Sequence, residues 1–280
     1  MAVFDPIQYK KIEREVYSLT AASYEKFGST SFEAYAQPLL EGAQLKPGQH
    51  VLDVACGTGI PSLMVSPLVE PGGTVTGIDL APGMIELAKK KAGERGLKNV
   101  TFQEADGESL PFADESFDTV LCNHGLVHMT DRAKALREMY RVLRKDYGIL
   151  ALSVWGTPDR ALTIGIVAMA IREIWPAAVI PGAPMWFDFG PEGVLEKTLT
   201  DAGFRNPQTT TYSVSLVVKS GEEYWEGVLG ISGRLQMLLK SIPQEAASKI
   251  KAKVIGTSEN FRSQGQIEIP CKEIIAIARR

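Results

Sequence analysis

The sequence predicts an α/β fold with a doubly wound parallel sheet. Two observations lead to this expectation. Between residues 50 and 155, short apolar runs alternate with segments of helical apolar spacing, and a glycine-rich turn follows the first of these runs. Strands that alternate with helices favour a parallel sheet with helices on both faces.

Five runs have the length and composition of buried strands, at residues 50–55, 74–78, 100–103, 117–122 and 149–155. Pro61 and Pro82 follow the first two runs. Because proline is tolerated in the first turn of a helix, each is expected to mark a helix start. A further helix is predicted from the i, i+3, i+4, i+7 spacing of apolar residues within 136–143.

The rest of the chain is more varied. The region before residue 46 is expected to be helical and outside the sheet. The later segments are read as a helical insertion at 158–187, a helix at 191–202, a β-rich run at 209–218, mostly helices at 221–256 and one or two closing strands at 267–278.

Composition limits the function classes. Hydrophobic residues make up 45% and charged residues 22% of the 280, as in ordinary globular proteins, and the net charge is −3. The basic run 89–91 reads as a solvated helix face. With no basic stripe, nucleic acid is not the expected partner.

Cysteine use and hydropathy predict a cytoplasmic location. The three cysteines are too few for a disulfide scaffold and do not have metal-site spacing. The uncharged run 161–171 is well short of the ~20 residues that a membrane span needs. The first residues lack the apolar core of a signal peptide.

The turn in "VLDVACGTGI" (residues 51–60) contains Gly57-Thr58-Gly59. A dinucleotide fingerprint needs a third glycine where Ser62 stands, and Pro61 removes an N–H that a phosphate would use. The two glycines alone are compatible with a dinucleotide site, another nucleotide site or a plain strand-to-helix turn.

Three carboxylates help to decide which kind of site the glycine turn forms. Asp53 lies in the first run, Asp79 closes the second run 26 residues later, and Asp106 follows the third. Ligands of open α/β sheets bind at the carboxyl ends of the strands, where an acid such as Asp79 can accept hydrogen bonds from both ribose hydroxyls. The pattern predicts a pocket that binds a nucleoside and has few groups that could bind a phosphate.

Four stretches resemble class I S-adenosylmethionine-dependent methyltransferases (methyltransferase type 11-like), in the group of ubiquinone/menaquinone-biosynthesis C-methyltransferases. They are "VLDVACGTG", "VTGIDLAPGMIELAKKKA", "VTFQEADGESLPFADESFDTVLCNHGLVHM" and "ALREMYRVLRKDYGIL", in family order over about residues 46–155. One departure is "RKDYGIL" (residues 144–150), where the family usually has a Lys-Pro-Gly-Gly turn.

The resemblance implies a Rossmann-like, seven-stranded, mostly parallel sheet with an antiparallel last strand. It also implies S-adenosyl-L-methionine as cofactor and S-adenosyl-L-homocysteine as product. We expect a single domain, divided into a helical cap (1–45), a cofactor-binding core (46–155), a lid insertion (156–189) and the remainder of the sheet (190–280) with a helical insertion (221–256).

By the same resemblance, Gly57 and Gly59 lie against the methionine part of the cofactor. Asp53 steadies that turn or the amino group, and Asp79 holds the ribose; their alternatives are a turn-stabilising acid and a helix cap. The full expected cofactor-binding set is Asp53, Gly57, Thr58, Gly59, Asp79, Leu80, Met84, Asp106, Gly107 and Asn123.

Leu80 and Met84 are expected to pack on the adenine, although plain core packing would also explain Met84. Asp106 is expected to accept from the adenine amino group, with Gly107 giving room, although Asp-Gly is also a common turn pair. Asn123 opens the loop where cofactor and acceptor meet.

His124 and His128 are the candidate catalytic bases; the alternative is that each only shapes its loop. A two-histidine metal site would need a third ligand, which the nearby sequence lacks, so no metal is expected. The expected acceptor pocket comprises Tyr24, Trp155, Trp186 and Phe187, which points to a small, apolar or aromatic methyl acceptor.

Two other functions remain open. The chain could be a non-catalytic module that binds S-adenosylmethionine or S-adenosylhomocysteine. A nicotinamide-dependent dehydrogenase is the other alternative, and Ser62 and Pro61 count against it.

Overall fold

The computed structural model describes residues 4–178 and 183–280, and for 27–31 only the backbone. Its centre is one sheet with strand order β3-β2-β1-β4-β5-β8-β6, and β7 pairs with β8 at the margin. The strands are β1 His50–Val54, β2 Thr74–Asp79, β3 Val100–Glu104, β4 Thr119–Asn123, β5 Ile149–Trp155, β6 Arg205–Val218, β7 Arg262–Ser263 and β8 Gln266–Arg279.

The pairing confirms the predicted sheet. Strands β1 to β5 pair in parallel, and β8 pairs antiparallel with both β5 and β6. The seven strands on the main path match the expected number, and the two-residue β7 is an addition. Because β1 to β4 are parallel neighbours, their carboxyl ends meet along one edge of the sheet.

The α-helices are α1 Pro6–Ala43, α2 Ile60–Val65, α3 Pro82–Glu94, α4 Arg132–Val142, α5 Leu162–Ile174, α6 Val194–Asp201, α7 Gly221–Ile231, α8 Gly233–Ser241 and α9 Gln244–Glu259. Pro61 and Pro82 lie in the first turns of α2 and α3, as predicted. The expected N-terminal cap is one long helix, α1, which begins after Asp5, whose carboxylate accepts from two backbone N–H groups.

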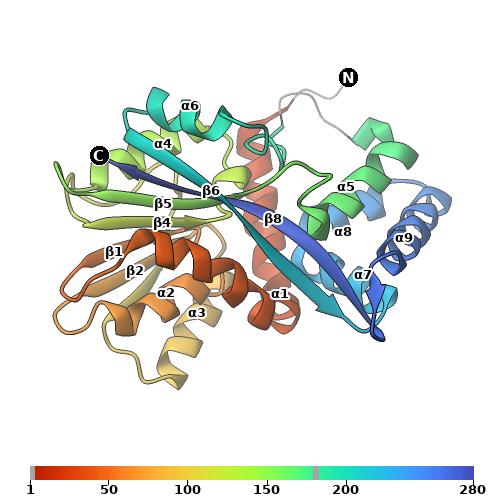
Figure 1. Cartoon of the computed structure of the whole chain (residues 1–280), viewed down its shortest axis with the longest axis horizontal. Helices are drawn as coiled ribbons and strands as arrows, with labels where there is room; N and C mark the ends of the chain where they lie inside the picture. Colours follow the sequence, from red (N-terminus) through yellow and green to blue (C-terminus); the bar gives the residue numbers. More distant parts are fainter. Residues whose placement is uncertain (1–3, 179–182) are drawn as a thin grey trace.

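Helices cover both faces of the sheet, with α2 and α3 on one side and α4 and α6 on the other (Figure 1). Side chains alternate across the strands, so Leu52 packs with α4 and Val51 packs with α2 and α3. Two cores therefore hold the sheet rigid and fix the positions of the loops at its edge.

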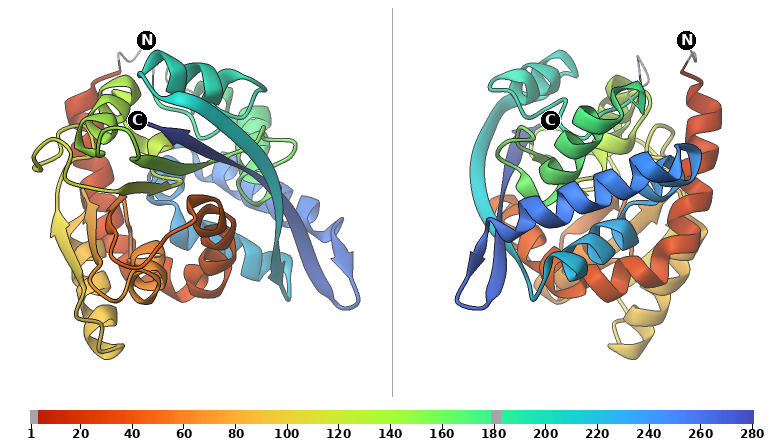
Figure 2. Two further views of the ribbon diagram at one scale, coloured as in Figure 1. Left: turned by 60° about the vertical axis from the view of Figure 1, so that its left-hand side comes forward. Right: turned by 90° about the vertical axis from the view of Figure 1, so that its right-hand side faces the viewer.

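Strands β6 and β8 extend past the parallel strands, where their far ends pack with α5, α7 and α9 in a third apolar cluster. Figure 2 shows these helices grouped beside α1. The predicted insertion at 158–187 is therefore partly packed structure, because Ile166 and Val167 of α5 are buried in this cluster. Within the described residues, no helix is long and apolar enough to cross a membrane.

Candidate functional site

The glycine turn after β1 uses its two glycines differently. Gly57 has φ +54°, and a Cβ added there would meet no atom within 4 Å. Gly59 has φ +83°, and its Cβ would approach Ala88 and Phe102 to 3.0 Å. Gly57 therefore leaves room on the open side of the turn, whereas Gly59 lets α2 pack closely on α3 and β3.

Asp53 lies beneath this turn. Its side chain is buried, and Oδ2 accepts a hydrogen bond of 2.5 Å from Ser62 Oγ in α2. Burial raises the pKa of Asp53 to about 7, although the Ser62 hydrogen bond opposes the shift. This geometry fits the turn-stabilising alternative for Asp53.

Asp79 ends β2 beside the same turn. Its Oδ2 accepts from the Gly57 N–H and its Oδ1 from the Ala81 N–H, both at 2.9 Å. Burial raises the pKa of Asp79, although the hydrogen bonds from Ala81 and Gly57 oppose it. Each oxygen keeps a second lone pair for a ligand donor.

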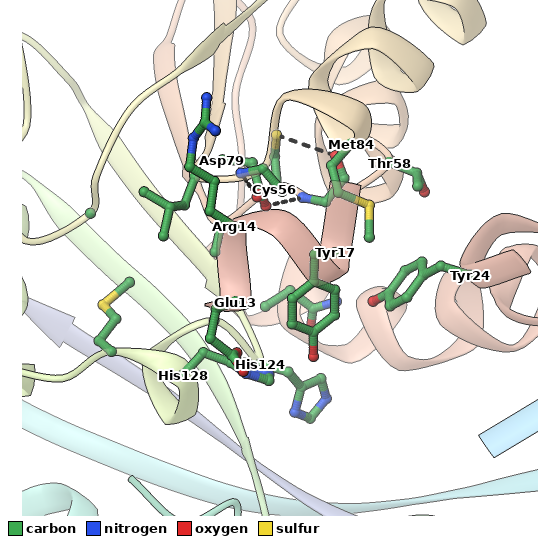
Figure 3. A pocket seen from close by; sticks show the side chains of 18 of the residues that line it. Glu13, Arg14, Tyr17, Tyr24, Cys56, Thr58, Asp79, Met84, His124 and His128 are labelled. Carbon is green, nitrogen blue, oxygen red and sulfur yellow. Dashed lines mark hydrogen bonds and ion pairs between the residues drawn. The ribbon is translucent and has the colours of Figure 1, made fainter. Parts of the chain in front are cut away.

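A pocket opens at the carboxyl ends of β1 to β4, between the sheet edge and α1 (Figure 3). It collects most of the residues that the sequence singled out. Those that line it are Tyr24, Gly57, Thr58, Asp79, Leu80, Met84, Asp106, Gly107, Asn123, His124, His128, Trp155 and Trp186.

Three expected residues are not among the lining residues of this pocket: Asp53, Gly59 and Phe187. Asp53 and Gly59 support the turn from below, as described above. Phe187 lies edge-on to Trp186, with ring centroids 6.4 Å apart, and packs against the main core. The expected lid includes residues 179–182, which lie outside the described residues.

Helix α1 supplies pocket residues that the sequence reading missed: Lys10, Glu13 and Arg14. Together with Tyr17 they follow the i, i+3, i+4, i+7 spacing of one helix face, so the spacing held the signal. Lys10 Nζ lies 2.7 Å from Asp106 Oδ2 and 2.6 Å from Glu108 Oε2. These ion pairs fasten the start of α1 to the loop after β3.

His128 also contacts α1. Its Nδ1 lies 3.1 Å from Glu13 Oε2, and its ring is edge-on to Tyr17. The other oxygen of the buried Glu13 accepts from Arg234 Nε at 2.9 Å. Burial lowers the pKa of Arg234 to about 10. His128 is thus held in a partly buried polar cluster between α1 and α8, with the buried Glu13 at its centre.

His124 is held from three directions. Its Nε2 lies 3.0 Å from Glu273 Oε2, its ring stacks on Trp155 with centroids 3.7 Å apart, and its backbone N–H donates to Ser153 Oγ at 3.0 Å. Asn123, just before it, accepts from Ser153 Oγ at 2.6 Å. His124 also has φ +54°, a backbone conformation uncommon for a non-glycine residue.

Aromatic side chains form the wall of the pocket opposite the sheet edge. Tyr24 stacks on Phe32, with centroids 4.7 Å apart, and lies edge-on to Tyr17. In Figure 3, Tyr17 projects from α1 between Asp79 and the two histidines, and Tyr24 lies to its right. Trp155 and Trp186 complete an apolar region near His124.

Comparison with known families matches residues 52–152 to the family described as "Methyltransferase domain". This segment is similar to methyltransferase domains. The match covers most of the region whose four stretches carry the resemblance, and it confirms that resemblance. It includes the glycine turn, Asp79, Asp106 and both pocket histidines.

Curated relatives align over about half of this chain. An uncharacterized methyltransferase, YcgJ, of Bacillus subtilis is 36% identical over 44% of this chain and 48% of its own length. Aklanonic acid methyltransferase DauC of Streptomyces sp. is 34% identical, over 50% and 63%. Demethylmenaquinone methyltransferase of Listeria welshimeri is 37% identical, over 46% and 57%. The chain thus covers less than two thirds of each of these relatives.

Solved structures share the fold over a longer span. The crystal structure of YcgJ matches with a TM-score of 0.59 at 23% identity, covering 88% of this chain and 98% of that one. The [4+2]-cyclase SpnF matches with a TM-score of 0.54 at 23% identity, covering 88% and 80%. Since a cyclase is among them, the fold alone does not specify the reaction.

Proposed function

We propose that the protein transfers a methyl group from S-adenosylmethionine to a small, apolar or aromatic acceptor. The observation that carries the proposal is the pairing of Asp79 with the open glycine turn at Gly57, inside a segment similar to methyltransferase domains. A carboxylate at the end of the second strand, beside a glycine that leaves room for a ligand, suits a ribose.

The residues fit the cofactor on two further observations. Thr58 Oγ1 lines the pocket, is buried and has no hydrogen-bond partner among the described residues, so a ligand group can satisfy it. Leu80 and Met84 give the pocket an apolar wall next to Asp79, which suits a purine ring. In this proposal Asp79 holds the ribose and Asp106 the adenine amino group.

When bound, S-adenosylmethionine supplies an electrophilic methyl group on a sulfonium sulfur. The protein's part is to align the acceptor and exclude water. The aromatic wall formed by Tyr24, Trp155 and Trp186 suits an apolar ring. The names of two relatives include the methyl acceptor: aklanonic acid in one and demethylmenaquinone, by name a quinone, in the other. These names support a ring-containing acceptor.

The lid is part of this proposal. Ile164 of α5 and Trp186 both line the pocket, so segments on each side of residues 179–182 border the acceptor space. Hydrogen exchange of 183–190 should slow when S-adenosylhomocysteine and an acceptor are bound together. Equal exchange in the free and bound protein would leave this segment as a fixed wall.

The test of the reaction is transfer of labelled methyl from S-adenosylmethionine to a panel of phenols, quinols, amines and thiols. Label in a small-molecule product supports the proposal. Binding of S-adenosylhomocysteine with no label transferred to any acceptor or extract would favour the non-catalytic binding module instead. Stabilisation by a nicotinamide cofactor alone would favour a dehydrogenase.

We infer as well that the protein works in a reducing compartment such as the cytoplasm. Cys56, Cys122 and Cys271 are all free and buried, which suits a compartment where thiols stay reduced. Detection of the protein in a secreted fraction would contradict this.

A further inference from the structure

We infer that Glu273 and His124 form a proton-accepting pair, and that the methyl acceptor carries an acidic hydroxyl of the phenol type. The inference rests on the proposed function and adds the acceptor's chemistry to it. Glu273 is a positioning residue, and His124 is the base that meets the acceptor.

The first support is the geometry of the pair. Glu273 Oε2 lies 3.0 Å from His124 Nε2, and the Glu273 side chain is 0% exposed. A carboxylate can only accept hydrogen bonds, so a neutral His124 carries its proton on Nε2 and keeps the lone pair on Nδ1. The orientation is the one that a general base needs when a carboxylate supports it from behind.

The second support is the free ring nitrogen. His124 Nδ1 is buried and has no hydrogen-bond partner among the described residues, although His124 lines the pocket. An unpaired buried polar atom lowers the stability of the folded state, so native proteins seldom keep one without a use. A hydroxyl of the acceptor, donating to Nδ1, would supply the missing partner.

The third support is how firmly the ring is held. Trp155 stacks on one face of the imidazole, and the Tyr35 ring meets it edge-on with centroids 6.0 Å apart. Glu273 stands opposite Trp155 in the β5–β8 register, so the sheet itself fixes the carboxylate. The left-handed backbone of His124 is the kind of strain that persists where the surroundings enforce it.

These features select the class of acceptor. A base contributes only if the acceptor has a proton to lose, and the neighbouring Trp155, Trp186 and Tyr24 suit an aromatic ring. In the step, the acceptor's O–H bond breaks and its proton forms a bond to Nδ1. The oxygen's electron pair forms the new bond to the methyl carbon, and the C–S pair stays on sulfur. The imidazolium, stabilised by Glu273, later releases its proton to water.

The first test needs no acceptor. In ¹⁵N-histidine NMR of the ligand-free protein, the His124 signals, assigned by their loss in His124→Gly, should show a protonated Nε2 and an unprotonated Nδ1. Glu273→Gln should mix the two tautomers, while His50→Gln, a change at the exposed end of β1, should leave the His124 signals unchanged. A proton on Nδ1 in the wild type, or no change in Glu273→Gln, overturns the pair.

The second test uses 1-naphthol with labelled S-adenosylmethionine, and N,N-dimethyl-1-naphthylamine as the acceptor without a proton to lose. Glu273→Gln should lower kcat for 1-naphthol about 100-fold or more, with KM within about twofold. Free imidazole should restore activity to His124→Gly, in which glycine accepts the left-handed backbone. Methylation of the amine but not of 1-naphthol overturns the acceptor class.

Calorimetry with S-adenosylhomocysteine distinguishes a failure of the proposed function from a failure of the Glu273–His124 pair. Wild type and Glu273→Gln should bind it equally. If neither binds, the proposed function fails, while the NMR result still decides whether the pair exists. If both bind and no tautomer change is seen, the pair fails and the proposed function stands.

Discussion

The carboxylate of Asp79 and the backbone N–H of Gly57 are joined by a 2.9 Å hydrogen bond between the end of β2 and the turn after β1. The bond sets the glycine turn at a fixed distance from the acid. It therefore shapes the part of the pocket where we place the ribose.

The first prediction concerns this acid. Asp79→Ala should weaken S-adenosylhomocysteine binding by about 1–3 kcal/mol, roughly 5- to 150-fold, because two ribose hydroxyls lose their acceptor. Calorimetry measures the effect, and circular dichroism confirms that the fold is retained. Asp114→Ala, a change at an exposed carboxylate that pairs with Arg141, is the control. Wild-type affinity in Asp79→Ala would rule out the ribose role.

Asp106 is predicted to contact adenine. Asp106→Ala should weaken S-adenosylmethionine and S-adenosylhomocysteine by the same factor, about tenfold, since both carry the same base. Asp106→Ala also breaks the ion pair between Asp106 and Lys10 of α1. Lys10→Met is the control for that loss, because it removes the Lys10 charge and leaves the Asp106 carboxylate in place. An equal loss in Lys10→Met would assign the effect to α1 anchoring.

The sequence predicted the parallel sheet and the pocket edge well, because both depend on local patterns. The apolar runs, Pro82 and the acids at strand ends are read within a few residues of one another. Glu273 could not be found in this way. It joins His124 across 149 residues, through the pairing of β8 with β5, and nothing in the local sequence of β8 marks it.

The α1 contacts show the same limit. Glu13 meets Arg234 across 221 residues, and only the packing of α1 beside α8 brings them together. The residue spacing indicates that Lys10 and Tyr17 share one face of α1, but it does not indicate which part of the chain that face packs against. Gly57 and Gly59 look equivalent in the sequence. In the folded chain, however, a Cβ added at Gly59 would crowd Phe102, whereas a Cβ added at Gly57 would face open space.

A third prediction follows from the buried Asp53. Its folded-state pKa, about 7, lies above the ordinary 3.8, so the folded protein binds this proton more tightly than the unfolded chain. Protonation of Asp53 therefore adds to the free energy of unfolding. This contribution is fully present below about pH 4 and is lost as pH rises through 7, and it falls by at most about 1.4 kcal/mol per pH unit.

Asp53→Asn removes this titration while keeping the side-chain shape. Denaturant unfolding from pH 4.5 to 8 (roughly the window of the shift) should show the variant gaining stability relative to wild type as pH rises. Asp114→Asn, at an exposed carboxylate, should follow the wild-type curve. Parallel curves for wild type and Asp53→Asn would contradict the assignment.

Trp186 gives the fourth prediction. Trp186→Ala should raise KM for 1-naphthol about 10-fold or more, since a large aromatic contact is lost, and should leave S-adenosylhomocysteine affinity unchanged. Trp175→Ala is the matched control, because Trp175 packs against the α5–α7–α9 cluster and does not line the pocket. A similar change in KM for both variants would point to general loosening of the insertion.

The central claim is that this pocket binds S-adenosylmethionine and its product, and calorimetric titration of the wild-type chain with S-adenosylhomocysteine tests it most directly. We expect one site per chain with a dissociation constant of about micromolar order, near 8 kcal/mol of binding free energy. It also predicts no heat of binding with NADH under the same conditions. Binding of NADH together with no binding of S-adenosylhomocysteine would contradict the account.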